Sequence, residues 1–197
     1  MDFATTPSDV DLLRLMMAGD ENAFTALYRR RQAAVYRFAL QMSGSETIAE
    51  DVTQEVFIAL MRDAQRYDSE RGSLAAFLYG IARNHVLRRL ERDRWFVPLA
   101  DPVVEDAITH EALIADGDPL GDLTRNEAIQ SLRLSILALP PHYREVVVLC
   151  ELGETSYEAA ARALGCPVGT VRSRLNRARA LLKAKLEAGR ERARCVA

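Results

Sequence analysis

Six side chains that can donate hydrogen bonds stand close together near the C-terminal end of the sequence: Thr170, Arg172, Ser173, Arg174, Asn176 and Arg177. An arginine can pair with both acceptors of a guanine edge, an asparagine with adenine, and a hydroxyl group with a phosphate. From Gly165 to Ala197 the chain carries nine basic residues against two acidic ones, although its formal net charge is -2. The segment is therefore either a nucleic-acid interface or a solvated basic helix.

The elements around these donors favour the nucleic-acid interface. A helix is predicted from Pro167 through Ala188, and its apolar residues recur at spacings of four, three and four, which places the donors on the outer side. These apolar residues are Val171, Leu175, Ala178 and Leu182. Thr155 with Glu158 forms a capping box for a preceding helix over 156–164, which Gly165 ends. The three-residue turn between the two helices has the length and glycine content of a helix-turn-helix.

A second cluster of charge lies in the N-terminal half. A helix is predicted over about 46–66, with Ile48, Val52, Val56 and Leu60 on its buried side. The opposite side carries Glu50, Asp51, Gln54 and Glu55. A polar loop over 67–72 follows, and then a helix over about 73–94 that turns Phe77, Ile81 and Val86 inward and ends in several arginines.

The predicted fold class is all-α, with two small helical domains over 8–95 and 123–190 and an acidic linker over 96–122. The linker holds seven acidic residues, no Lys or Arg, and several prolines and glycines. Capping signals at Ser8, Asp20 and Thr124 predict further helices, and Pro140 must follow the end of the last of these. No segment shows a convincing strand alternation.

Several function classes find no support in the sequence. No stretch approaches the ~20 apolar residues of a membrane span, and the N-terminus lacks the pattern of a signal peptide, so a cytoplasmic protein without membrane insertion is expected. Cys150, Cys166 and Cys195 form no metal-binding or disulfide pattern. There is no glycine-rich phosphate loop, and we expect no cofactor, no metal and no catalytic residues.

Two long motifs resemble the extracytoplasmic-function sigma factors of bacterial RNA polymerase, which are group IV of the sigma-70 family. The C-terminal match runs from Leu139-Pro140 through Tyr143–Val147 and Ser156–Ala161 to Leu164–Arg179. The N-terminal match covers Ala49–Phe57, Tyr67–Ser73 and Phe77–Asn84. Together the resemblance extends over roughly 10–185.

The resemblance implies a non-enzymatic subunit that binds core RNA polymerase and directs promoter-specific initiation, with promoter DNA and an anti-sigma factor as further partners. The C-terminal donors named first would read the minus-thirty-five element, and Glu50, Asp51, Gln54 and Glu55 would face core polymerase. The residues implied for the melted minus-ten element are Tyr67, Asp68, Ser69, Arg71, Arg83, Asn84 and Arg88. Phe77 stands where the family often has tryptophan, and Gly80 where a basic residue is common.

Two other interpretations remain open. A dimeric helix-turn-helix regulator would bind duplex DNA alone, with the N-terminal helices as a dimerisation or sensing domain, and a palindromic site would indicate it. An enzyme would need a centre such as a metal held by Glu50, Asp51 and Glu55. No histidine joins these acids, so a charged solvent face is favoured.

Overall fold

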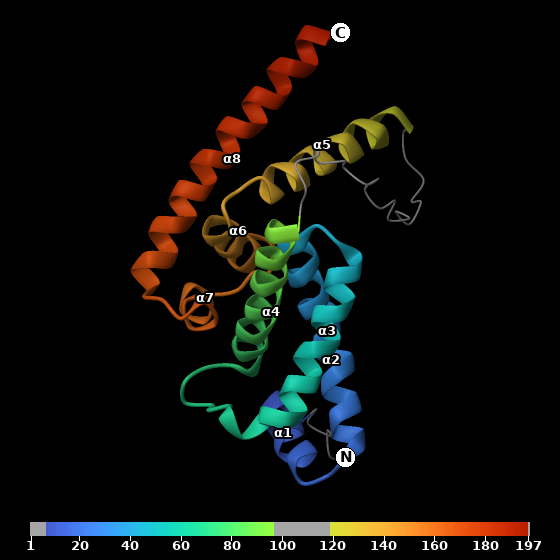
Figure 1. Cartoon of the computed structure of the whole chain (residues 1–197), viewed down its shortest axis with the longest axis vertical. Helices are drawn as coiled ribbons and strands as arrows, with labels where there is room; N and C mark the ends of the chain where they lie inside the picture. Colours follow the sequence, from blue (N-terminus) through green and yellow to red (C-terminus); the bar gives the residue numbers. More distant parts are fainter. Residues whose placement is uncertain (1–6, 97–118, 197) are drawn as a thin grey trace, which may run out of the picture.

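The computed structural model describes residues 7–96 and 119–196, and every regular element in these ranges is helical, which confirms the all-α class. The first group of elements comprises α1 (Asp9–Met17), α2 (Glu21–Ser43), α3 (Glu46–Asp63), the 3-10 turn η1 (Ala64–Arg66) and α4 (Leu74–Phe96). The second comprises α5 (Pro119–Leu137), α6 (Pro141–Val147), the π-helical turn η2 (Val148–Leu152), α7 (Tyr157–Leu164) and α8 (Val168–Val196) (Figure 1).

Local signals set most of the helix boundaries as the sequence predicts. Ser8 and Asp11 form the reciprocal capping box of α1, and the Asp20 carboxylate accepts from the backbone N–H groups of Asn22 and Ala23 at the start of α2. Gly44 and Gly165 end α2 and α7 with φ of 74° and 63°. Only glycine adopts this left-handed conformation without a steric cost, so both chain reversals depend on it.

Two predicted boundaries in the C-terminal half are wrong. The cap of α7 is Ser156, whose hydroxyl accepts from the Ala159 N–H at 3.2 Å, whereas the Thr155 hydroxyl donates to the Gly153 carbonyl at 3.2 Å. Helix α5 begins at Pro119 and not after Thr124, because the fixed φ of proline suits a first helical position. Of the predicted linker, 97–118 lies outside the described residues and 119–122 is helical.

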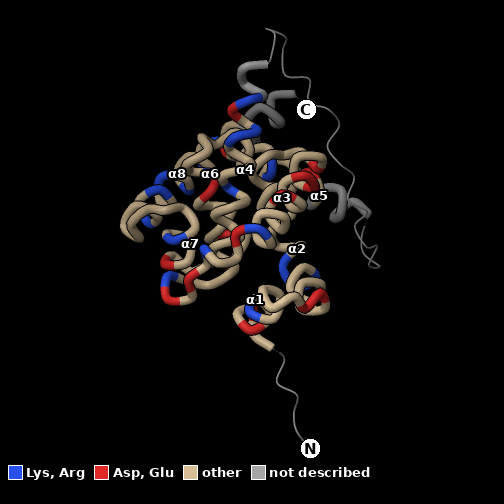
Figure 2. Tube along the Cα trace, turned by 60° about the horizontal axis from the view of Figure 1, so that its bottom comes forward, with Lys and Arg blue, Asp and Glu red and all other residues tan. Residues whose placement is uncertain are grey.

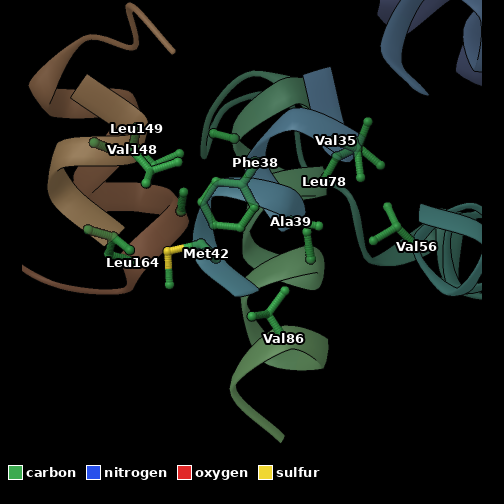
Figure 3. Packing of buried hydrophobic residues seen from close by; sticks show 14 of the residues in the cluster. Val35, Phe38, Ala39, Met42, Val56, Leu78, Val86, Val148, Leu149 and Leu164 are labelled. Carbon is green, nitrogen blue, oxygen red and sulfur yellow. The ribbon is translucent and has the colours of Figure 1, made fainter. Parts of the chain in front are cut away.

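The two groups of helices share one buried hydrophobic cluster. In the first group, Leu27 and Val35 of α2 belong to the same buried cluster as Val52 and Val56 of α3, and all four are essentially inaccessible to solvent. Phe38 and Met42 of α2 also face side chains of the second group, including Val148, Leu149 and Leu164 (Figure 3). Each buried Leu or Val contributes about 1.5–3 kcal/mol relative to an exposed position. The two predicted domains are therefore joined by an apolar contact, which the sequence did not predict.

The buried side of α4 differs in part from its prediction. Leu74, Leu78 and Val86 are buried at multiples of four residues, whereas Phe77 and Ile81 are half-buried and line a cleft. Helix α7 packs along α4, and α8 extends from it well beyond the rest of the fold (Figure 1). None of the described helices has both the length and the hydrophobicity to cross a membrane.

Candidate nucleic-acid interface

Helices α7 and α8 form the predicted helix-turn-helix. The turn is closed by the Cys166 N–H, which donates to the Ala161 carbonyl at 3.0 Å, and by the Thr170 N–H, which donates to the Pro167 carbonyl at 2.9 Å. Val171, Leu175 and Ala178 of α8 are buried, as the apolar spacing predicts. Because these side chains attach α8 to the fold, the opposite side of its N-terminal part is available to a ligand.

Four of the six predicted donors lie on this available side. Arg172, Ser173, Asn176 and Arg177 are exposed, and basic residues recur along α8 (Figure 2). The Arg172 guanidinium lies 5.9 Å from the centre of the Tyr157 ring, a cation–π contact between α8 and α7. Exposed donors at the start of a helix are what contact with base edges and phosphates requires.

The other two donors, Thr170 and Arg174, are half-buried. Arg174 Nη1 lies 3.2 Å from Oε1 of Glu145, a carboxylate of α6 that is only 1% exposed. The same carboxylate accepts from Arg83 Nε of α4 at 2.6 Å. Arg174 therefore holds α8 against α6, a contact that the sequence did not predict.

A cleft of about 440 Å³ lies between the 67–72 loop, α4 and α7. The Tyr67 hydroxyl donates to the Gly72 carbonyl at 3.0 Å, and the Tyr67 ring packs on Phe77 with centroids 5.7 Å apart, so the loop has a fixed shape. Burial, together with the charges of Asp9 and Asp68, raises the pKa of the Tyr67 hydroxyl. Aromatic rings beside cationic side chains form a surface suited to unpaired bases.

The structure brings five of the seven predicted minus-ten residues together in this cleft. They are Tyr67, Asp68, Arg71, Arg83 and Asn84. Ser69 is exposed on the loop but does not line the cleft, and Arg88 lines a separate hollow with His85 and Arg92. Arg162 and Leu164 of α7 line the other wall, which could not be predicted because they are distant in the chain and carry no local signal.

The acidic side of α3 forms a surface whose carboxylates are partly paired with side chains of α4. Glu50, Asp51 and Gln54 are exposed and Glu55 is half-buried. Arg89 of α4 donates to Asp51 and to Glu55, each at 2.8 Å, and His85 Nδ1 lies 2.6 Å from Glu55. Burial acts to lower the pKa of Arg89, but the hydrogen bonds and charges of Asp51 and Glu55 outweigh this effect, so the net change in its pKa is upward.

These acids do not assemble a metal centre with other ligands. Within 7–96 and 119–196, no three His, Cys, Asp or Glu side chains converge in a way that could hold a metal ion. Asp51 and Glu55 share an arginine instead, and Glu50 and Gln54 face solvent. The arrangement presents a negatively charged, hydrogen-bonding surface to solvent.

Two family models match the chain in the regions that carry these surfaces. Sigma-70 region 2 matches residues 27–96, which include α3, the 67–72 loop and α4. Sigma-70, region 4 matches residues 129–182, which include the helix-turn-helix. The matches therefore fall on both halves and leave out the stretch between them.

Whole-chain comparisons agree with these matches. The ECF RNA polymerase sigma-E factor of Escherichia coli is 34% identical over 185 residues, which cover 91% of this chain and 95% of that protein. The ECF RNA polymerase sigma factor SigE of Mycolicibacterium smegmatis is 34% identical over 84% of this chain, which spans 63% of that protein's length.

A solved structure supports the same assignment at the level of the fold. The sigma factor RpoE of Bartonella quintana, crystallised in complex with the anti-sigma factor NepR, is 26% identical with a TM-score of 0.66. The match covers 83% of this chain and 96% of that one. The chain therefore belongs to the extracytoplasmic-function sigma factors of the sigma-70 family.

Proposed function

We propose that this chain is a sigma factor that binds core RNA polymerase and directs promoter-specific transcription initiation. The observation that carries the proposal is the presence, in one chain, of an exposed donor surface on a helix-turn-helix and an aromatic, basic cleft in the other half. The first suits duplex DNA and the second suits unpaired bases. Membership of the sigma-factor family links the two surfaces to one process, the initiation of transcription at a promoter.

The C-terminal half, over 123–190, reads the minus-thirty-five element in this proposal. Arg172 and Arg177 contact base edges, while Thr170 and Ser173 contact phosphates. Asn176 lies on the same exposed side and can pair with adenine. Arg174 stays in the proposed set, with the further task of orienting α8 through Glu145.

The N-terminal half, over 8–95, binds core polymerase and handles the minus-ten element. Extruding a base from a duplex costs a few kcal/mol, and a protein without a nucleotide-hydrolysing site must recover this cost from binding. The cleft offers the Tyr67 and Phe77 rings, with Arg83 and Asn84 beside them and Arg88 further along α4 for the phosphates. The acidic surface of α3 docks on polymerase through Glu50, Asp51, Gln54 and Glu55.

The chain acts without a catalytic centre or cofactor of its own, and it works in the cytoplasm because RNA polymerase is there. An anti-sigma factor is a further proposed partner, since the similar sigma factor RpoE of Bartonella quintana was crystallised with one. Binding of the anti-sigma factor would block the surfaces that this chain uses to contact polymerase and DNA.

Reconstitution with core polymerase tests the proposal. Purified chain, core RNA polymerase and fragmented genomic DNA are incubated with nucleotides, and the 5′ ends of the transcripts are sequenced, with core polymerase alone as the control. The proposal predicts new start sites that share two upstream sequence elements. It fails if the chain adds no start sites, or if the chain alone binds palindromic duplex DNA as a dimer, as a helix-turn-helix regulator would.

A further inference from the structure

Helices α3 and α4 lie side by side, and charged and polar side chains join them at the acidic side of α3 (Figure 1). Asp51 and Glu55 are one helical turn apart on α3, and His85 and Arg89 are one turn apart on α4. Arg89 Nη1 donates to Asp51 Oδ2 and Arg89 Nη2 to Glu55 Oε1, each at 2.8 Å. His85 Nδ1 lies 2.6 Å from Glu55 Oε2. These four side chains form one continuous α3–α4 ladder.

The basic members of the α3–α4 ladder lie deeper than the acidic ones. The side chains of Arg89 and His85 are 19% and 27% exposed, whereas those of Glu55 and Asp51 are 40% and 49% exposed. A partner that approaches from solvent therefore meets the carboxylates first. A carboxylate can accept about four hydrogen bonds, and Arg89 engages Oδ2 of Asp51, so a partner can bind this carboxylate while Arg89 stays in place.

The neighbouring bases of α4 point elsewhere. Arg88 and Arg92 are exposed, whereas His85 and Arg89 are half-buried. Helix α4 therefore turns one pair of basic side chains towards α3 and another towards solvent. A half-buried guanidinium that donates to two acids is suited to fixing those acids, whereas the exposed pair is suited to contact with phosphates.

Arg89 has two opposing effects on a basic partner of the α3 acids. Its charge repels such a partner, but the repulsion acts across the carboxylates and is screened by salt over about 10 Å at 0.1 M ionic strength. Its guanidinium also holds two flexible acidic side chains in one arrangement, so binding does not have to immobilise them. Salt and water weaken the repulsion and leave the ordering intact, so the ordering is the larger effect.

We propose that Arg89 and His85 are positioning residues for core RNA polymerase, and that they hold Asp51 and Glu55 in the orientation that docking requires. They act through the two acids and do not contact polymerase themselves. The inference rests on the proposed function, because it takes the acidic side of α3 as the docking surface. It extends the determinants of docking from α3 to α4.

Substitutions at Arg89 separate positioning from charge. Arg89→Gln removes both the guanidinium fork and its charge, and Arg89→Lys keeps the charge without the fork. Arg92→Gln is the matched control, because it removes the same charge from an exposed position on the same helix. Thermal melting checks that each full-length variant is folded. Titration of labelled chain with purified core polymerase, at low and at high salt, measures the affinity.

We expect Arg89→Gln to weaken binding to core polymerase about tenfold, as for two side chains that must be ordered on binding. The loss should persist at high salt, and Arg89→Lys should recover part of it. Arg92→Gln should bind like the unaltered chain. The positioning role is wrong if Arg89→Gln binds as tightly as the unaltered chain or more tightly, since Arg89 would then be only a counterion, or if Arg92→Gln causes an equal loss.

His85→Ala should cause a smaller loss than Arg89→Gln, because His85 contacts Glu55 and Arg89 contacts both acids. An affinity equal to that of the unaltered chain would exclude His85 from the positioning role.

A double-mutant cycle shows whether Arg89 acts through the acids. In a chain with Asp51→Asn and Glu55→Gln, measured at low salt where weak binding is detectable, Arg89→Gln should cause no further loss, because no carboxylate remains to be positioned. A loss of the same size in both backgrounds would overturn the proposal. If the unaltered chain does not bind core polymerase, the proposed function itself fails, whereas equal binding by the unaltered chain and every variant defeats the positioning role alone.

Discussion

The arginine side chains of this molecule fall into two groups. Some are exposed to solvent, and others are paired with a buried carboxylate. Arg172 and Arg177 lie exposed on α8, where DNA can reach them. Arg83 and Arg174 share the buried carboxylate of Glu145. A buried carboxylate needs a counterion, so each of the latter two contributes to the stability of the free chain as well as to any contact with DNA.

The first prediction concerns Arg177. Arg177→Ala should weaken binding of the holoenzyme to the minus-thirty-five element by about 1–3 kcal/mol and relax base preference there, because a guanine-pairing arginine carries both affinity and specificity. Competition between mapped and scrambled upstream elements measures both effects. Lys185→Ala is the control, with a smaller loss that is equal on the two DNAs. Equal losses for Arg177→Ala would make it a phosphate contact.

The second prediction concerns Arg174. Arg174→Ala should lower the free energy of unfolding by about 1–3 kcal/mol, because the buried Glu145 loses one of its two hydrogen-bonding partners. Arg174→Lys keeps a charge and should cost less. Urea unfolding of the free chain measures the loss. An unchanged midpoint together with relaxed base preference would show that Arg174 reads bases directly and has no structural part.

At the scale of the element, α3 presents its two faces to different neighbours. Val52, Val56 and Leu60 are buried against the rest of the fold, while the acidic side faces outward. Asp51 and Glu55 are already paired with Arg89, so reversing their charges would also disturb α4. Glu50 and Gln54 are the better probes of docking.

The third prediction uses these probes. Glu50→Lys with Gln54→Lys should slow association with core polymerase about tenfold and weaken its salt dependence, because charges at the rim of an interface mainly control the association rate. Stopped-flow binding at several salt concentrations measures this. Glu21→Lys, an exposed acid at the start of α2, is the matched control. A folded double variant with unaltered kinetics would remove α3 from the docking surface.

The fourth prediction concerns the 67–72 loop. Replacing Asp68, Ser69, Glu70 and Arg71 with glycine and serine should reduce transcription from duplex promoters more than from promoters with a pre-melted bubble. The Asp68 side chain accepts from the Glu70 N–H at 2.9 Å, so the replacement also removes local order from the loop. The ratio of the two activities is the measurement. Equal losses would assign the loop to base recognition alone, and unchanged activity on both would exclude it.

Local elements could be predicted from the sequence, and contacts between distant elements could not. The caps at Ser8, Asp20 and Gly165 act within a few residues, so their residue types predict the helix boundaries. Thr and Ser are both common residue types at an N-cap, so the sequence alone does not decide between Thr155 and Ser156. In the structure Ser156 has the extended backbone of an N-cap residue, and it caps α7.

The Arg83–Glu145 pair joins residues 62 positions apart. No periodicity or cap connects them, and the pair exists only because apolar packing brings α4, α6 and α7 together. The same reason explains why the sequence located one wall of the cleft, the 67–72 loop with α4, and missed the wall that α7 supplies.

Across the whole molecule, the two proposed DNA-binding surfaces differ in which parts of the chain form them. The exposed side of α8 faces solvent, whereas the cleft between the 67–72 loop and α4 has α7 as its other wall. The α8 surface is therefore formed by the C-terminal half alone, whereas the cleft is formed by both halves.

Permanganate oxidises unpaired thymines, so the reactivity of promoter thymines shows whether this chain opens a promoter together with core polymerase. A mapped promoter is treated in the presence of core polymerase alone, of the chain alone, and of both together. We expect reactive thymines at the minus-ten element only when both are present, and fewer of them with Arg83→Ala. Reactivity without the chain, or none with both proteins on a promoter that they transcribe, would contradict it.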